Sequence, residues 1–384
     1  MNKQYLVAAG FTALMACTPA LAHEDLRLKT WLKNAEAKTT QPFEQSQIQA
    51  QLGNMWTELK DEQRSKILFE QARVNAAKVN EPYVRELLKG HLANELASGG
   101  AFPQALEKLN TIEDTDVWVK TAWKLIGKLA KADETEQAKI LLLETETRSH
   151  AVQDPMLRAE LLSGTGASYR YLDQKHGENL VYEAHGIAQM LSDLYERALM
   201  FNESGAHLMD IGHRERAVSV FDEVDRLVNE IENPLHQAKA LAMLGGEQAE
   251  KGLRDRSVKA LDRGYAIASQ LPGNDDTYAV LSEIARNYGQ SHAFEKAIKV
   301  AQSIPDAYHR VEGYIRIAKN QYRQGQQAQA LSLLSLAEKD ALKVEQPYRQ
   351  AIVLRKLASE RVTAKQPDQA KTLLSKAEAL IDNS

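Results

Sequence analysis

Histidines and carboxylates are the residues of this sequence that could hold a metal ion or transfer protons. The 384 residues include 10 histidines, but no His-Glu-x-x-His motif occurs, and no two histidines share a helical face with a carboxylate at ligand spacing. His207 and His213, for example, are six residues apart, which fits neither three nor four. We therefore expect structural or solvated histidines, and we predict neither a metal site nor a cofactor.

The sequence also indicates no nucleophile. The single cysteine, Cys17, lies near the N-terminus, and neither a Gly-x-Ser-x-Gly motif nor a phosphate-binding glycine loop occurs. The glycines of Gly164-Thr165-Gly166 fall inside a predicted helix, where they favour close helix packing. We predict no catalytic residues and a protein that is not an enzyme.

The charge balance weighs against a nucleic-acid partner. A formal net charge of −4 provides no overall positive field to attract phosphates. With 43% hydrophobic and 26% charged residues, the composition is typical of an ordered, water-soluble protein. Beyond Ala22 no stretch is apolar enough to predict a transmembrane segment.

The segment from Met1 to Ala22 has the three parts of a secretory signal peptide. Lys3 is its only charge, the run from Tyr5 to Cys17 is almost entirely apolar, and Ala20-Leu21-Ala22 forms an A-x-A ending. We expect cleavage before His23, export and a periplasmic location. The less favoured alternative is a lipoprotein acylated at Cys17, because the residues before it match a bacterial lipobox poorly.

Pairs of small residues twelve positions apart recur along the chain. Each pair begins with Gly or Ala after a large apolar residue and ends with a small residue that opens a second apolar run. The pairs are Gly53/Ser65, Ala93/Ala105, Gly205/Ala217, Gly245/Ser257, Ala285/Ala297, Ala318/Ala330 and Ala358/Ala370, with Gly127/Ala138 one residue shorter and Gly166 opening a degenerate unit near Gly177. The pattern predicts nine helix-turn-helix units whose small residues lie where two helices approach closely.

Prolines and glycines predict where these helices begin and end. Proline suits the first turn of a helix, and four prolines precede the first small residue of a unit by about three helical turns: Pro82, Pro155, Pro234 and Pro347. Glycine suits a turn, and four glycines lie five positions before the second small residue: Gly100, Gly212, Gly252 and Gly325.

The spacing between successive units is nearly constant, with two exceptions. The steps from Ala93 to Gly127 and from Ala285 to Ala318 are shorter than the others by about two helical turns. Removing two whole turns keeps the apolar face pointing the same way, so both lengths can stack in one array. The two short steps predict second helices that end early.

Leu244-Gly245 with Ser257, and Ile317-Ala318 with Ala330, resemble the core of the tetratricopeptide repeat. That family also has a bulky residue four positions before the Gly or Ala, matched here by Leu241. The resemblance implies an all-α fold, a right-handed α-solenoid of about nine tetratricopeptide-like units. Most units here are longer than the usual repeat of that family.

The predicted layout has three parts. Residues 1–22 are the signal peptide, residues 23–44 are an N-terminal capping helix, and residues 45–384 are the repeat array. In tetratricopeptide arrays the first helices of the units line the concave surface, which implies a groove for a ligand.

The groove positions implied by the resemblance are rich in basic residues. They lie three before the first small residue and one, four and five after it, and the candidate binding residues are Lys124, Lys128, Lys131, Arg170, Tyr171, Asn202, Arg286, Lys319, Tyr322, Arg323 and Arg355. Lysine and arginine bind carboxylates, so we predict a protein or peptide partner of acidic character. The alternative is that basic residues populate every face of a long helical surface.

A tyrosine and an arginine recur in the first turn of three first helices, as Tyr83/Arg85, Tyr195/Arg197 and Tyr308/Arg310. The helix macrodipole opposes a cation there, so another group must offset it. Either each arginine pairs with an acid of the preceding unit while the tyrosine packs between units, or these pairs form a row of anion sites.

The last predicted helix carries an apolar face made by Leu373, Leu374, Ala377, Leu380 and Ile381. Repeat arrays normally end with a polar capping helix, so we expect this face to be exposed and to allow self-association.

The leading interpretation is a non-catalytic, exported scaffold that binds a protein or peptide in its concave groove. The alternatives are a structural subunit of an envelope or secretion assembly, and a polysaccharide-binding module.

Overall fold

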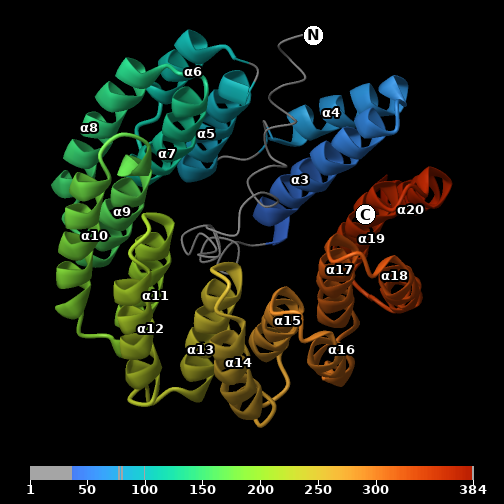
Figure 1. Ribbon diagram of the computed structural model, residues 1–384. Helices are drawn as coiled ribbons and strands as arrows, with labels where there is room; N and C mark the ends of the chain where they lie inside the picture. Colours follow the sequence, from blue (N-terminus) through green and yellow to red (C-terminus); the bar gives the residue numbers. More distant parts are fainter. Residues whose placement is uncertain (1–36, 77, 79–80, 99, 383–384) are drawn as a thin grey trace. The chain divides into compact units, whose positions relative to one another are not determined.

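The structure, a computed structural model, describes residues 37–76, 78, 81–98 and 100–382 (Figure 1). This part of the chain contains eighteen α-helices and no strand, which confirms the predicted all-α fold. The predicted signal peptide lies outside the described residues, as does most of the predicted capping helix. The remainder of that segment, from Ala37, is the beginning of the first described helix.

The chain divides into two compact units, residues up to 95 with 304–384 (unit 1) and residues 96–303 (unit 2). The helices of unit 1 are α3 (Ala37–Glu58), α4 (Glu62–Ala76), most of α5 (Pro82–Ser98), α17 (Ala307–Arg323), α18 (Gln327–Ala341), α19 (Pro347–Thr363) and α20 (Pro367–Asp382). Those of unit 2 are α6 (Phe102–Leu109), α7 (Thr115–Lys131), α8 (Thr135–Ala151), α9 (Pro155–Ser168), α10 (Gln174–Gln189), α11 (Leu194–Asp210), α12 (Arg214–Val228), α13 (Pro234–Glu250), α14 (Arg254–Ala268), α15 (Asp275–Gln290) and α16 (Phe294–Ser303).

Consecutive helices pack as antiparallel pairs, such as α13 with α14 and α17 with α18 (Figure 1). The four prolines begin α5, α9, α13 and α19, as predicted. The two early stops are also confirmed, because α6 has 8 residues and α16 has 10, whereas α12, α14 and α18 have 15. None of the described helices combines the length and the hydrophobicity that crossing a bilayer requires.

The turn between the helices of a pair has a left-handed residue five positions before the second small residue. Four of these residues are the predicted glycines, with φ from 77° to 88°. In four other pairs a residue with a side chain takes the same position, with φ from 59° to 63°: Lys60, Asp133, His292 and Lys365. The turn geometry therefore repeats even where the glycine is missing, at a conformational cost to the residue with a side chain.

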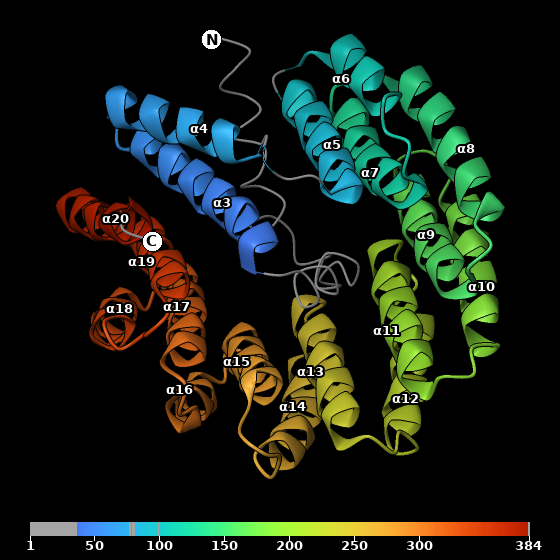
Figure 2. The same cartoon turned by 180° about the vertical axis from the view of Figure 1, so that it is seen from behind.

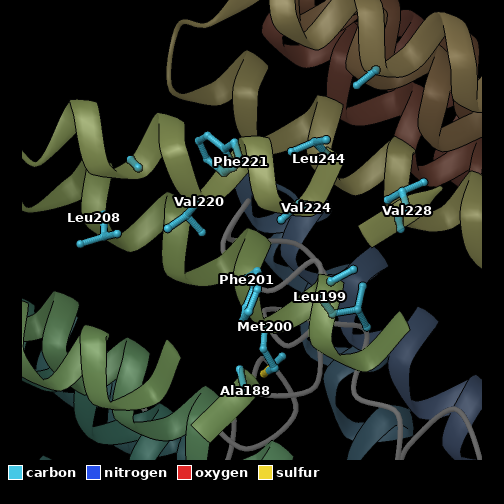
Figure 3. Packing of buried hydrophobic residues seen from close by; sticks show 14 of the residues in the cluster. Ala188, Leu199, Met200, Phe201, Leu208, Val220, Phe221, Val224, Val228 and Leu244 are labelled. Atoms are coloured by element: carbon cyan, nitrogen blue, oxygen red, sulfur yellow. The ribbon is translucent and has the colours of Figure 1, made fainter. Parts of the chain in front are cut away.

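The small residues lie where two helices touch. A Cβ atom placed on Gly205 would be 2.7 Å from Phe221, and one on Gly245 would be 2.6 Å from Leu261. On Gly166 it would be 2.6 Å from a backbone oxygen, that of Gly177 on the paired helix. Figure 3 shows the apolar residues around these contacts in unit 2, where Phe201, Phe221 and Leu244 belong to one buried cluster.

Long polar side chains eight residues before the first small residue connect successive pairs. Each donates a hydrogen bond to a backbone carbonyl at or just after the end of the preceding helix: Arg197 to Leu191 (3.0 Å), Gln237 to Val228 (3.0 Å), Arg310 to Pro305 (2.9 Å) and Gln350 to Ala341 (3.0 Å). These carbonyls carry the negative end of the preceding helix dipole, so they offset the unfavourable placement of a cation in a first turn.

The tyrosines of the same turns pack between units. The ring of Tyr195 stacks on His236 with centroids 4.4 Å apart, and Arg349 lies over the ring of Tyr308 at 5.0 Å. Arg197 and Arg310 are therefore structural in this fold, and a row of anion sites is not supported. The partner group differs from the predicted one, because Arg310 pairs with Asp340 of the following helix (2.7 Å) rather than with a preceding acid.

The predicted exposed face at the C-terminus is wrong for the described residues. Within unit 1, α3 packs against α19 and α20, and both views show these helices together (Figures 1 and 2). Leu374 and Ala377 are fully buried, and Leu373 and Ile381 are nearly so. The apolar face is therefore covered by the first helix pair of the same chain, which removes the basis for predicting self-association through it.

Candidate functional site

Three of the predicted binding residues come together in unit 1. Lys319 and Arg323 lie on α17 and Arg355 lies on α19, and all three act electrostatically on the carboxylate of Glu360. The Lys319 Nζ atom is 3.6 Å from Glu360 Oε1. Burial raises the pKa of Glu360 even though the three cations oppose that shift. The fourth residue predicted there, Tyr322, is half-buried on α17.

A second carboxylate, Glu312 on α17, lies on the same pair of helices. Lys356 Nζ is 2.6 Å from Glu312 Oε1, and Arg316 Nε is 3.7 Å from Glu312 Oε2. Burial alone would raise the pKa of this carboxyl, but the positive charges of Lys356 and Arg316 outweigh burial and hold its pKa below the ordinary value. Glu312 is therefore an ionised, well-matched counterion.

Positive charge is in excess on this pair of helices, which we call the α17–α19 face. It comprises five cations and two carboxylates: Arg316, Lys319, Arg323, Arg355, Lys356, Glu312 and Glu360. Burial lowers the pKa of Arg355, and its Nε atom is buried without a hydrogen-bond partner in the described part of the chain. The positive charges of this face thus exceed the negative ones by three, and an anion would stabilise the half-buried guanidinium of Arg355.

Cations on the second helices of unit 2 show a different pattern. The cation one residue before the second small residue pairs with an acid of the preceding second helix. These pairs are Arg216 with Glu178, Arg256 with Asp222, and Lys296 with Asp262. The α17–α19 face differs from this pattern because its cations outnumber its acids.

The predicted binding residues of unit 2 are distributed over α7, α11, α15 and the turn after α9. Lys124 and Lys128 are half-buried on α7 and Lys131 is exposed at its end. Arg170 lies 3.9 Å from Asp210, and Arg286 pairs with Glu283 of its own helix.

Of the two further residues predicted in unit 2, one is buried and the side chain of the other is not described. Asn202 is only 3% exposed on α11. Tyr171 belongs to a short 3-10 turn, η2 (Tyr169–Tyr171), and its side chain lies outside the described residues.

The first helices of unit 2 instead carry buried acids. Lys120 on α7 lies 2.8 Å from Asp116 and 2.7 Å from Glu160 of α9. Burial, reinforced by Glu160, raises the pKa of Glu203 on α11 well above its ordinary value. Burial, reinforced by Glu250, raises the pKa of Glu247 on α13 to about 7.

None of these carboxylates is among the predicted binding residues, because none lies at a groove position implied by the tetratricopeptide resemblance. Glu247 and Glu360 both lie two residues after the first small residue of their units. The same position holds His207, and Asn287, which is fully buried. A polar residue that recurs at this position was the available signal.

The structure brings one hydroxyl and one imidazole together on neighbouring first helices. Ser163 Oγ lies 2.8 Å from His207 Nδ1, but Ser163 is only 2% exposed, so a substrate could not reach its hydroxyl. Among the described residues, no group of three or more His, Cys, Asp or Glu side chains could hold a metal ion.

No family model matches the chain, and no curated protein matches it. Solved structures to which it is similar include that of Ton1535 from Thermococcus onnurineus NA1, at 15% identity and a TM-score of 0.43, covering 76% of this chain and 98% of that one. Another is a Rap protein complexed with Competence and Sporulation Factor, at 13% identity and a TM-score of 0.34, covering 88% and 98%.

A third is a signal transduction ATPase with a tetratricopeptide repeat sensor, PH0952 from Pyrococcus horikoshii, at 15% identity and a TM-score of 0.32, covering 99% of this chain and 63% of that one. Because all three TM-scores are low, the fold is assigned from the helix pairs, turns and small-residue contacts described above. The fold is tetratricopeptide-like.

Proposed function

We propose that the protein is a non-catalytic, exported scaffold whose α17–α19 face binds an acidic segment of a protein or peptide. The observation that carries the proposal is the excess of cations on this face, with Lys319, Arg323 and Arg355 gathered around one carboxylate. Export is the part of the proposal that depends on the sequence of residues 1–22 alone.

An acidic peptide fits the chemistry of this face. Lysine and arginine side chains on two neighbouring helices offer several donors in a row, and successive carboxylates of an extended segment can pair with them. Lys319 and Arg323 are exposed, so pairs with them should weaken as salt is added, whereas Arg355 and Lys356 are half-buried and would pair in a medium less polar than water.

The proposal is tested by the affinity for a fluorescein-labelled hexaglutamate peptide. Lys319→Glu/Arg323→Glu reverses two exposed charges of the face, and it should weaken binding about tenfold or more. The matched control is Lys371→Glu/Lys376→Glu, which makes the same charge change at exposed positions of α20. The control should bind as the wild type does.

Comparing the two variants distinguishes an effect of charges on the α17–α19 face from an effect of the protein's net charge. Equal losses in the two variants would mean that net charge alone governs the binding. An unchanged affinity in Lys319→Glu/Arg323→Glu would place the binding elsewhere and overturn the proposal. Thermal melts of both variants establish that the helices remain folded.

A further inference from the structure

We infer that Glu360 is an internal competitor for the ligand, whose carboxylate occupies the cations of the α17–α19 face until an acidic group of the partner displaces it. This inference rests on the proposed function and concerns how the same site is controlled. In this role a buried acid controls ligand binding, which a purely structural counterion would not do.

The geometry distinguishes Glu360 from the other carboxylate of the face. Glu312 is held at 2.6 Å by Lys356, a distance typical of a short charge-assisted hydrogen bond. Glu360 is 3.6 Å from Lys319, which is beyond a good hydrogen bond, and the Lys319 side chain is 48% exposed. Lys319 can therefore leave Glu360 for a ligand carboxylate with little loss of interaction.

Glu360 is also poorly stabilised as an anion. It is only 8% exposed, and burial raises its pKa although Lys319, Arg323 and Arg355 all favour the charged form. The carboxylate thus remains near three cations without satisfying them, and the Nε atom of Arg355 stays without a partner in the described part of the chain.

Two acids on helices packed against α19 have partners other than the cations around Glu360. Glu338 of α18 lies 2.6 Å from Arg361, and Glu378 of α20 accepts a hydrogen bond from Trp56 of α3. The charges that act on Glu360 are those of Lys319 and Arg323 on α17 and of Arg355 on α19 itself.

Competition has a defined dependence on pH. A carboxyl with a raised pKa takes up a proton before an ordinary glutamate does as the pH falls. Protonation removes the internal negative charge and leaves the cations to the ligand. As the pH falls, the affinity of the wild type for an acidic peptide should therefore approach that of a variant that lacks this carboxylate.

The test is the affinity of wild type, Glu360→Gln and Glu345→Gln for fluorescein-labelled hexaglutamate between pH 7.5 and 5.5. Glu360→Gln should bind about tenfold more tightly at pH 7.5, and its affinity should change little with pH. Glu345→Gln removes the same charge at an exposed position of unit 1 and should follow the wild type.

The outcomes separate this inference from the proposed function. If Glu360→Gln binds no more tightly than wild type while both bind, the internal competitor is excluded and the anion-binding face stands. If neither binds, the proposed function fails. If Glu360→Gln does not fold, Glu360→Ala decides, because it removes the same carboxylate: tighter binding than wild type at pH 7.5 supports the inference, and equal binding overturns it.

Discussion

Lys120 shows at the scale of single residues how unit 2 tolerates several buried acids. Burial by itself lowers the pKa of this lysine, but Glu160 and Asp116 more than compensate and hold the pKa above its ordinary value. The ammonium group therefore stays charged between two carboxylates, and its charge also lowers the pKa of Glu203 against the larger effect of burial. One cation thus acts on acids of three successive first helices, α7, α9 and α11.

Replacing Lys120 by Met should destabilise the protein strongly. The variant leaves Asp116 and Glu160 buried without their counterion, which costs about 3–5 kcal/mol at neutral pH. Urea unfolding at pH 7.5 measures this loss. Lys139→Met, which breaks an exposed pair with Glu136, is the control, and equal losses in the two variants would refute the argument.

Glu247 gives a second prediction at this scale. Its folded-state pKa of about 7 lies above its unfolded value, so the folded state holds the proton more tightly. Stability from this group is complete below the unfolded pKa and is lost as the pH rises through about 7. Glu247→Gln should therefore melt at a higher temperature than wild type at pH 8. If the melting temperatures of the two proteins differ by the same amount at every pH from 5 to 8, the raised pKa of Glu247 is contradicted.

At the scale of the elements, the recurring left-handed turn unites pairs whose sequences look different. His292 and Lys365 adopt positive φ angles of 63° and 59°, and Gly252 and Gly325 adopt 77° at the same turn position. A residue with a Cβ atom is strained there, whereas glycine is not. The spacing from the second small residue therefore identifies the turn in every one of these pairs, with or without glycine.

Glycine should be the better residue at these turn positions. His292→Gly and Lys365→Gly should each stabilise the protein by up to ~1 kcal/mol, and Gly252→Ala should destabilise it by about 1–2 kcal/mol. The control is Gly186→Ala inside α10, where a Cβ atom meets no neighbour and where alanine should stabilise the helix. Chemical denaturation of the four variants checks the signs. A loss of stability in both glycine variants would show that φ does not govern these turns.

The elements also show what the sequence could and could not predict. The prolines and the spaced small residues predicted helix starts and close contacts, because both follow from local backbone geometry. The groove positions located Lys319, Arg323 and Arg355, yet they missed Glu360, because the resemblance carried no position for a buried acid. Burial of Asn202 was not predictable either, since it depends on how neighbouring first helices pack.

At the scale of the whole chain, segments from its beginning and its end form one compact unit. Trp56 of α3 donates a hydrogen bond to Glu378 of α20, and Arg64 of α4 lies 3.2 Å from Ser375. The guanidinium of Arg64 also covers the Trp56 ring at 4.5 Å. The two hydrogen bonds join helices at opposite ends of the sequence, which a reading of local repeats could not foresee.

Loss of the Trp56 side chain should therefore destabilise α20 as well as the helices near Trp56 in the sequence. Trp56 is 2% exposed, so Trp56→Ala should cost about 3–5 kcal/mol. Amide hydrogen exchange should rise in α20 as well as in α3 and α4. Phe221→Ala, a core truncation in unit 2, is the control and should leave α20 protected. Unchanged exchange in α20 of Trp56→Ala would contradict the packing of α3 on that helix.

The most direct test of the central claim is to locate a bound acidic peptide by zero-length carbodiimide crosslinking, which joins a lysine amine to a carboxylate within contact distance. With hexaglutamate and the wild-type chain, mass spectrometry should find the crosslinks at Lys319 on α17, and only weak ones at Lys371 and Lys376 on α20. High salt should remove them, as expected for charge pairing. Crosslinks spread evenly over the exposed lysines, or concentrated on α20, would contradict an anion-binding site on the α17–α19 face.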